Sequence, residues 1–91
     1  MTEPCRIDVW LWRARFYKTR ALSAAACEAG HIRLERQGQP VTRVEKAAQG
    51  VRPGDRLIFA VGSRVVTLQI TGLGERRGPA PEAQSLYRLD V

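Results

Sequence analysis

The sequence has few of the residues and patterns on which several protein classes depend. Its two cysteines, Cys5 and Cys27, and its one histidine, His31, stand apart in the chain. A disulfide framework or a zinc cluster is therefore not expected. No apolar run approaches the roughly 20 residues of a membrane span, and the first five residues lack the basic start and apolar core of a secretion signal. We expect a cytoplasmic protein that contacts no membrane and holds no metal ion or other cofactor.

Residue sets that support catalysis are also missing from the sequence. There is no pair of carboxylates at a useful spacing, no glycine-rich phosphate loop and no Cys/His dyad suggested by position. With 91 residues, the chain has material for one small core and little room for a substrate cavity. We therefore expect neither an enzyme nor a small-molecule substrate. The oligomeric state cannot be inferred from these features.

Positive charge is present in excess and is unevenly placed. The chain has 15 Lys and Arg residues against 9 Asp and Glu, a net charge of +6. Residues 6–20 carry +4 of this charge, since they contain five cations and one acid, Asp8. Those cations are Arg6, Arg13, Arg15, Lys18 and Arg20. The planar guanidinium group of arginine suits bidentate contacts with phosphate and stacking on bases, so a nucleic acid is the partner to expect.

Two helices are predicted in the N-terminal third of the chain. The first, over residues 7–15, has an apolar face with helical spacing, formed by Ile7, Trp10, Leu11 and Ala14. Trp12 lies off this face and either packs on a neighbour or stays partly open as a stacking surface. Thr19 is the predicted N-cap of the second helix, and Gly30 is placed to end it in a left-handed conformation. The predicted inner face of this second helix consists of Leu22, Ala25, Ala26 and Ala29.

After Gly30 the apolar period changes from 3.6 residues to 2. Residues 31–35 therefore form a predicted strand, with Ile32 and Leu34 inward and Arg33 outward. A short edge strand over 40–42 and an irregular surface loop over 42–51, with Val44 tucked in, are expected next. Two longer strands, 57–61 and 64–71, form a predicted hairpin, and residues 81–87 can make one or two helical turns. The fold class is α+β: two N-terminal helices packed on a small, mainly antiparallel sheet, with a short C-terminal helical turn.

The start of the second helix is the predicted anion site. A helix that begins at Thr19 directs free backbone N–H groups and the positive end of its dipole at whatever binds there. Lys18 and Arg20 lie at this end and repel each other, so an external anion would stabilise them. Asp8 is expected to orient guanidinium groups such as that of Arg6, or to cap the first helix, and not to act as a catalyst.

Several ordered motifs resemble the RNA-binding domain named after the fourth small-subunit ribosomal protein. They are Arg-Ile-Asp-Val-Trp-Leu at 6–11, Arg-Phe-Tyr-Lys-Thr-Arg-Ala-Leu at 15–22, Glu-Ala-Gly-His-Ile-Arg-Leu at 28–34 and Pro-Gly-Asp-Arg-Leu at 53–57. Within that superfamily, the Trp-Leu-Trp motif at 10–12 is similar to the bacterial heat-shock protein fifteen family. The resemblance implies an S-four-like fold (the alpha-L motif) over residues 4–72, followed by a Gly/Pro-rich C-terminal segment over 73–91.

The same resemblance implies non-enzymatic binding of structured RNA. The implied partner is ribosomal RNA of the large subunit, in a stress-related rescue or recycling role. Carried over position by position, the RNA surface consists of Arg6, Arg13, Arg15, Lys18, Thr19, Arg20 and Arg33. The loop over 36–52 is longer than the common form of the domain, so no base contacts are assigned to it.

Two alternatives remain open from the sequence. The chain could be an accessory RNA-recognition factor for an RNA-modifying enzyme such as a pseudouridine synthase. It could also be a protein-interaction module or a peripheral membrane binder, although its one apolar stripe is needed to pack the second helix.

Overall fold

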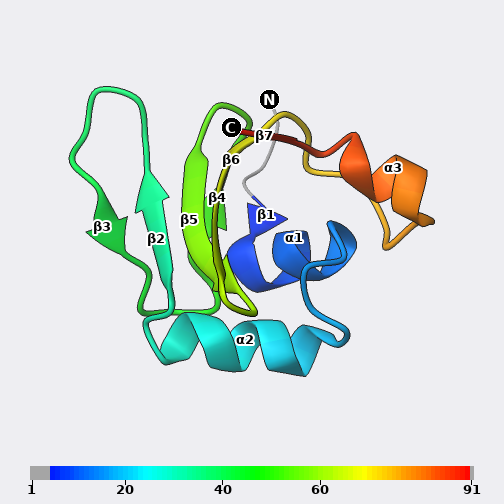
Figure 1. Cartoon of the computed structure of the whole chain (residues 1–91), viewed down its shortest axis with the longest axis horizontal. Helices are drawn as coiled ribbons and strands as arrows, with labels where there is room; N and C mark the ends of the chain where they lie inside the picture. The colour runs from blue at the N-terminus through cyan, green and yellow to red at the C-terminus, as the bar shows by residue number, and fades with distance from the viewer. Residues whose placement is uncertain (1–4, 91) are drawn as a thin grey trace.

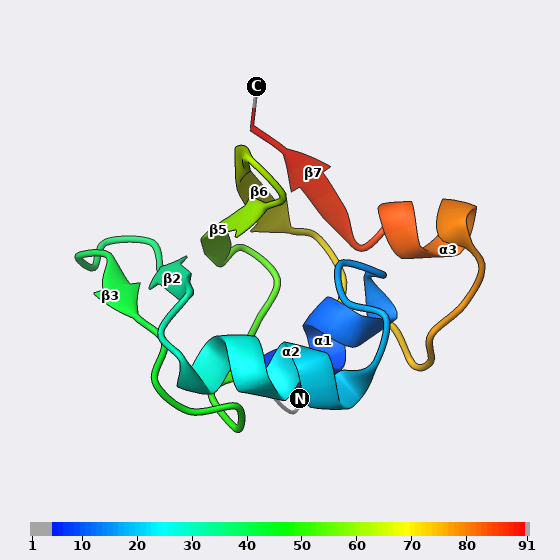
Figure 2. The ribbon, with the colours of Figure 1, turned by 60° about the horizontal axis from the view of Figure 1, so that its bottom comes forward.

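Two helices pack against one face of a curved antiparallel sheet in the computed structural model, which describes residues 5–90 (Figures 1 and 2). The helices are α1 (Ile7–Arg13) and α2 (Arg20–Glu28). The five strands, in spatial order, are β3 (Thr42–Arg43), β2 (Ile32–Glu35), β5 (Arg56–Val61), β6 (Arg64–Ile70) and β7 (Tyr87–Leu89). A separate two-stranded pair consists of β1 (Cys5–Arg6) and β4 (Gly50–Val51), and α3 (Ala80–Gln84) precedes β7. The predicted fold class is confirmed.

The apolar face of α1 forms the centre of the core, as its spacing predicts. Ile7, Trp10 and Leu11 are fully buried, and the indole N–H of Trp10 donates to the carbonyl oxygen of Gly72 at 2.8 Å. The helix ends two residues before its predicted end, because Arg15 has a φ of +66°, which a right-handed helix cannot accommodate. This backbone turn directs the chain back toward α2.

The ends of α2 agree with the sequence, but its inner face does not. The Thr19 hydroxyl oxygen accepts a hydrogen bond from the Leu22 N–H at 3.1 Å, and Gly30 follows the helix with a φ of +77°, so both predicted ends are confirmed. The predicted inner face is wrong at most of its positions, because Ser23 and Cys27 are the buried residues, Leu22 is 53% exposed, and of the predicted set Ala26 alone packs against the core. The bulky side chains of α1 already fill the space beneath the sheet, so α2 approaches through small residues.

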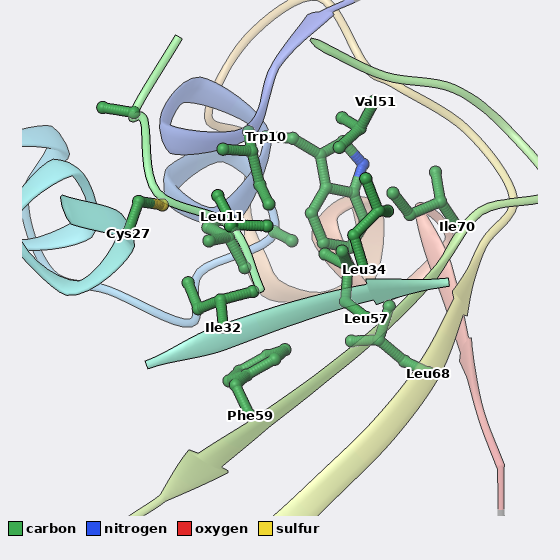
Figure 3. Close-up of a cluster of buried hydrophobic side chains, with 14 of the residues drawn as sticks. Trp10, Leu11, Cys27, Ile32, Leu34, Val51, Leu57, Phe59, Leu68 and Ile70 are labelled. Carbon is green, nitrogen blue, oxygen red and sulfur yellow. The ribbon is translucent and has the colours of Figure 1, made fainter. Parts of the chain in front are cut away.

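Burial of Cys27 fixes the chemical state of its thiol. The side chain packs in the core cluster shown in Figure 3. Loss of hydration on burial raises the pKa of Cys27 to about 11. The thiol therefore stays protonated at neutral pH and packs as a small apolar group.

Alternating strand residues supply the other side of the core. Ile32 and Leu34 of β2 point toward the helices, whereas Arg33 between them is exposed, which confirms the predicted orientation (Figure 3). Phe16 and Tyr87 extend the core at its edge, with ring centroids 4.8 Å apart. Helix, interhelical turn and last strand thus meet in one apolar cluster.

The loop after β2 is more ordered than its composition predicts. Val44 is buried as expected, but Val51 is buried as well and belongs to β4. The loop also covers the start of α1, because the Ile7 N–H donates to the carbonyl oxygen of Gln49 at 2.7 Å. Strands of only two residues leave no readable period, which explains why β3 lies at 42–43 instead of 40–42 and why β4 was not expected.

The C-terminal part of the described chain joins the sheet. The helical turn expected near residues 81–87 is α3, which ends at Gln84, and β7 then pairs with β6 in antiparallel register. Sequence periodicity does not predict β7, since it is three residues long. Within residues 5–90, no helix has the length and apolar character that crossing a membrane requires.

Candidate nucleic-acid interface

The turn between α1 and α2 brings a group of cations to the surface. Lys18, Thr19 and Arg20 are all exposed at the start of α2, and Arg6 lies just before α1. The side chains of Arg6 and Arg20 are each about half exposed. We call Arg6, Lys18, Thr19 and Arg20 the helical site.

A buried carboxylate holds two of these cations together. Asp8 is only 2% exposed, and its two oxygens accept hydrogen bonds from Nε and Nη2 of Arg6, both at 3.1 Å. Arg20 Nε donates to Asp8 Oδ2 at 3.5 Å. Since Arg6 precedes α1 and Arg20 begins α2, Asp8 links the two helices. The expectation that Asp8 orients guanidinium groups is confirmed.

The first turn of α2 adds open backbone donors to the helical site. Thr19 satisfies the N–H of Leu22 through its side chain and that of Ser23 through its carbonyl oxygen. Within residues 5–90, the N–H groups of Arg20 and Ala21 have no acceptor. Together with the helix dipole, they form a position suited to an anion beside the guanidinium groups.

Arg13 and Arg15, which the sequence also assigns to the RNA surface, both donate hydrogen bonds within the described chain. Arg13 is half-buried, and its Nη1 donates to the carbonyl oxygen of Gly74 at 2.9 Å. Arg15 Nε donates to the carbonyl oxygen of Gly78 at 2.7 Å, although the rest of this exposed side chain remains at the surface. Both arginines therefore hold residues 74–78 against the end of α1, and Arg15 is the more exposed of the two.

Trp12 contacts the C-terminal segment through its backbone, and Arg33 lies on the sheet. Trp12 is half-buried, and its carbonyl oxygen accepts a hydrogen bond from Arg77 Nε at 3.2 Å. Arg33 is exposed on β2 and points away from the helices, because its neighbours Ile32 and Leu34 point toward them. The structure thus brings four of the seven predicted RNA-binding residues together and leaves Arg33 on another face.

Leu22 is an exposed apolar residue that the sequence pattern wrongly places on the inner face of α2. It lies in the first turn of α2, directly after Arg20 and Ala21, and presents an apolar side chain near the start of the helix. A readable signal did exist, because Ser23, Cys27 and Gly30 form a stripe of small residues at helical spacing. Ser23 and Cys27 of that stripe are the buried residues of α2, whereas Leu22 is exposed.

The cap at Thr19 gives a first testable prediction. Thr19→Ala should lower the free energy of unfolding by about 1 kcal/mol, because the Leu22 N–H loses its acceptor. Urea denaturation measures this change, and Thr19→Ser should restore most of the stability. The exposed Thr42 provides the matched control, with an expected effect of Thr42→Ala within about 0.5 kcal/mol. An unchanged urea midpoint for Thr19→Ala would show that the cap contributes nothing.

The part of the chain that the structure describes contains no candidate metal-binding site. No three His, Cys, Asp or Glu side chains gather there in a way that could hold a metal ion.

Comparisons with known proteins agree with this geometry. The S4 domain family model matches residues 5–57. The heat shock protein 15 homolog of Haemophilus influenzae is 37% identical over 83 residues, which are 91% of this chain and 59% of that protein. Heat shock protein 15 of Escherichia coli K12 is 35% identical over 82 residues, 90% of this chain and 57% of that protein. The chain thus spans a little under three fifths of the length of these curated relatives.

Two further comparisons each cover most of this chain and most of the matched protein. The RQC P-site tRNA stabilizing factor of Halalkalibacterium halodurans is 33% identical over 84 residues, 92% of this chain and 88% of that protein. A solved structure of trimeric heat shock protein 15 from Vibrio cholerae superposes with a TM-score of 0.81 at 38% identity, covering 97% of this chain and 83% of that one. The chain therefore belongs to the S4 domain family, in which its relatives include bacterial heat shock protein 15.

Proposed function

We propose that this chain is a non-enzymatic RNA-binding protein whose helical site binds the phosphate backbone of structured RNA. The observation that carries the proposal is the buried Asp8, which holds Arg6 and Arg20 together beside the open end of α2. A fixed pair of guanidinium groups loses little side-chain entropy when it binds phosphate. Its charge-assisted hydrogen bonds are also stronger than those between neutral groups.

The arrangement favours recognition of RNA shape over recognition of base sequence. Lys18 and the two guanidinium groups are cationic donors, and the backbone N–H groups of Arg20 and Ala21 add two more donors. All of them match phosphate oxygens, which carry no sequence information. Leu22 is the nearby apolar group that can contact a ribose or an unpaired base. We therefore infer that the fold of the RNA positions several phosphates at once over the helical site.

Ribosomal RNA of the large subunit, or tRNA bound there, is the partner that we infer. The names of the relatives, heat shock protein 15 and RQC P-site tRNA stabilizing factor, support a ribosome-associated role after stress. In that role the protein rescues or recycles large subunits in the cytoplasm, where ribosomes work. Catalysis is not part of the proposal, because the described cluster consists of cations and one carboxylate already paired with two arginines.

Crosslinking in cells tests this proposal. The tagged full chain is crosslinked to RNA by ultraviolet light after heat shock, and the attached RNA is sequenced. We expect reads concentrated in one region of large-subunit ribosomal RNA or in tRNA, and we expect their loss when Lys18 and Arg20 are both replaced by glutamine. Reads spread over messenger RNA in proportion to abundance would contradict the proposed partner.

A further inference from the structure

The face of the sheet that turns away from α1 and α2 carries a second group of arginines. In Figures 1 and 2 both of these helices lie on one side of the sheet, and no helix covers the other side. Strand register places two cross-strand rows on this outer face. The first row is Arg43, Arg33, Ile58 and Thr67, and the second is Glu35, Arg56, Gln69 and Arg88. We propose that this outer face is a second surface for RNA phosphates.

Arg33 and Arg43 are the centre of this surface. They are directly opposite each other in the antiparallel register of β2 and β3, where two like charges destabilise a sheet. Within residues 5–90, Arg33 forms no ion pair, and Arg43 reaches only Glu45, at 3.7 Å. An external anion between the two guanidinium groups would remove their repulsion, so the pair is suited to a phosphate.

The shape around this pair leaves room for a backbone. An open hollow of about 560 Å³ is lined by Arg33, Val41, Thr42, Arg43 and Glu45. The stem of Arg43 rests against Gly30, since its Cδ lies 3.0 Å from the position a Cβ would take there. Glycine at position 30 thus allows Arg43 to lie along the hollow with its guanidinium group exposed.

The acidic residues near the outer face form only weak ion pairs with its arginines. Glu45 and Arg43 are both well exposed, and the Arg56–Asp90 pair has an N–O distance of 3.5 Å at the rim. Exposed pairs of this kind contribute about 0–1 kcal/mol, so a phosphate can compete with them. Arg88 is bonded to the neutral amide oxygen of Gln69 at 2.9 Å and keeps its full charge.

The composition of the outer face selects phosphate over bases. The two rows contain four arginines, one glutamate (Glu35), a glutamine, a threonine and an isoleucine, and no aromatic ring that could stack on an unpaired base. Contacts from this face should therefore be independent of sequence. Because it lies on the opposite side of the sheet from the helices, an RNA segment bound to it is a different segment from the one at the helical site. This inference rests on the proposed RNA-binding function but concerns a separate surface.

Native mass spectrometry of the full chain with a 12-base-pair RNA duplex tests the inference. We expect two duplexes per chain for the unmodified protein and one for the double variant Arg33→Gln, Arg43→Gln, whose second dissociation constant should rise at least tenfold. The double variant Arg52→Gln, Arg64→Gln is the matched control, because both arginines are exposed and form no ion pair within the described chain. Thermal unfolding should show that all variants remain folded.

The outcomes separate this surface from the helical site. A single duplex on the unmodified protein, or two duplexes retained by the Arg33 and Arg43 variant, would overturn the inference and leave the proposed function intact. Equal losses in the control would overturn it as well, since only total charge would then matter. Replacing Lys18 and Arg20 could also remove no duplex while replacing Arg33 and Arg43 removes one. That result would support RNA binding at the outer face and contradict RNA binding at the helical site.

Discussion

Replacing Lys18 and Arg20 together by glutamine should weaken binding of a folded fragment of large-subunit ribosomal RNA by about 30-fold. Each substitution removes an exposed ionic contact with phosphate of about 1 kcal/mol, and a total of about 2 kcal/mol corresponds to that factor. Lys18 is exposed and forms no ion pair within residues 5–90, whereas Arg20 also pairs with the buried Asp8 at 3.5 Å, so urea denaturation must show that the double variant remains folded. Fluorescence anisotropy with the labelled fragment at constant salt measures the dissociation constants.

The control for this variant must change the total charge equally and leave the site intact. Arg52 and Arg64 are exposed in a turn and at the end of a hairpin, and replacing both by glutamine should weaken binding less than about threefold through the general field. Arg76 and Arg77 are less suitable, because they bond to Glu82 and to the carbonyl oxygen of Trp12. Equal losses for the site variant and the control would show that binding depends on net charge alone.

Asp8→Asn should weaken RNA binding by about tenfold, although it raises the net charge from +6 to +7. The substitution keeps the shape of the side chain but removes the charge that holds Arg6 and Arg20 together. Two guanidinium groups near an uncharged buried amide then repel each other and lose their fixed orientation. We also expect the free energy of unfolding to fall by about 2 kcal/mol, since a buried ion pair loses one partner while the arginines stay half exposed.

Glu45→Gln provides the matched comparison for Asp8→Asn. It makes the same change of charge, but Glu45 is exposed near the outer face, and within residues 5–90 its only ion pair is the long one with Arg43. General electrostatics predicts equal or tighter RNA binding for both variants, whereas the positioning role of Asp8 predicts opposite effects. A folded Asp8→Asn protein should bind RNA more weakly than Glu45→Gln does. Equal dissociation constants for the two variants would show that Asp8 does not position the arginines for RNA binding. Circular dichroism and urea denaturation show whether each variant is folded at the assay temperature.

Local patterns were enough to predict much of the fold. The spacing of Ile7, Trp10 and Leu11 predicts the buried face of α1, and the hydroxyl of Thr19 predicts the start of α2. Both depend on neighbours within a few residues, so the sequence alone carries the information. The inner face of α2 was predicted wrongly because it depends on how the large α1 side chains fill the core, which no local pattern records.

In the candidate site, too, contacts between residues close in the sequence could be predicted, whereas contacts between distant residues could not. Clustering of charge over residues 6–20 is visible in the sequence, and so is the pairing of Asp8 with Arg6 two residues away. Arg13 donates to a carbonyl group 61 residues further along the chain, so its charge could not be told apart from that of Arg20 before the structure was known. The outward direction of Arg33 was predicted from strand alternation, but its separation from the helical site follows from the packing of β2 on the helices.

The dependence of RNA affinity on salt concentration tests the central claim most directly. If the helical site and its neighbours neutralise four to six phosphates, the logarithm of the association constant should fall with the logarithm of salt concentration at a slope of about −3 to −5. Replacing Lys18 and Arg20 should make this slope shallower by about two units, since two phosphate contacts are lost. A flat salt response of the unmodified protein, or an unchanged slope in that variant, would contradict the assignment of the helical site as the place where RNA binds.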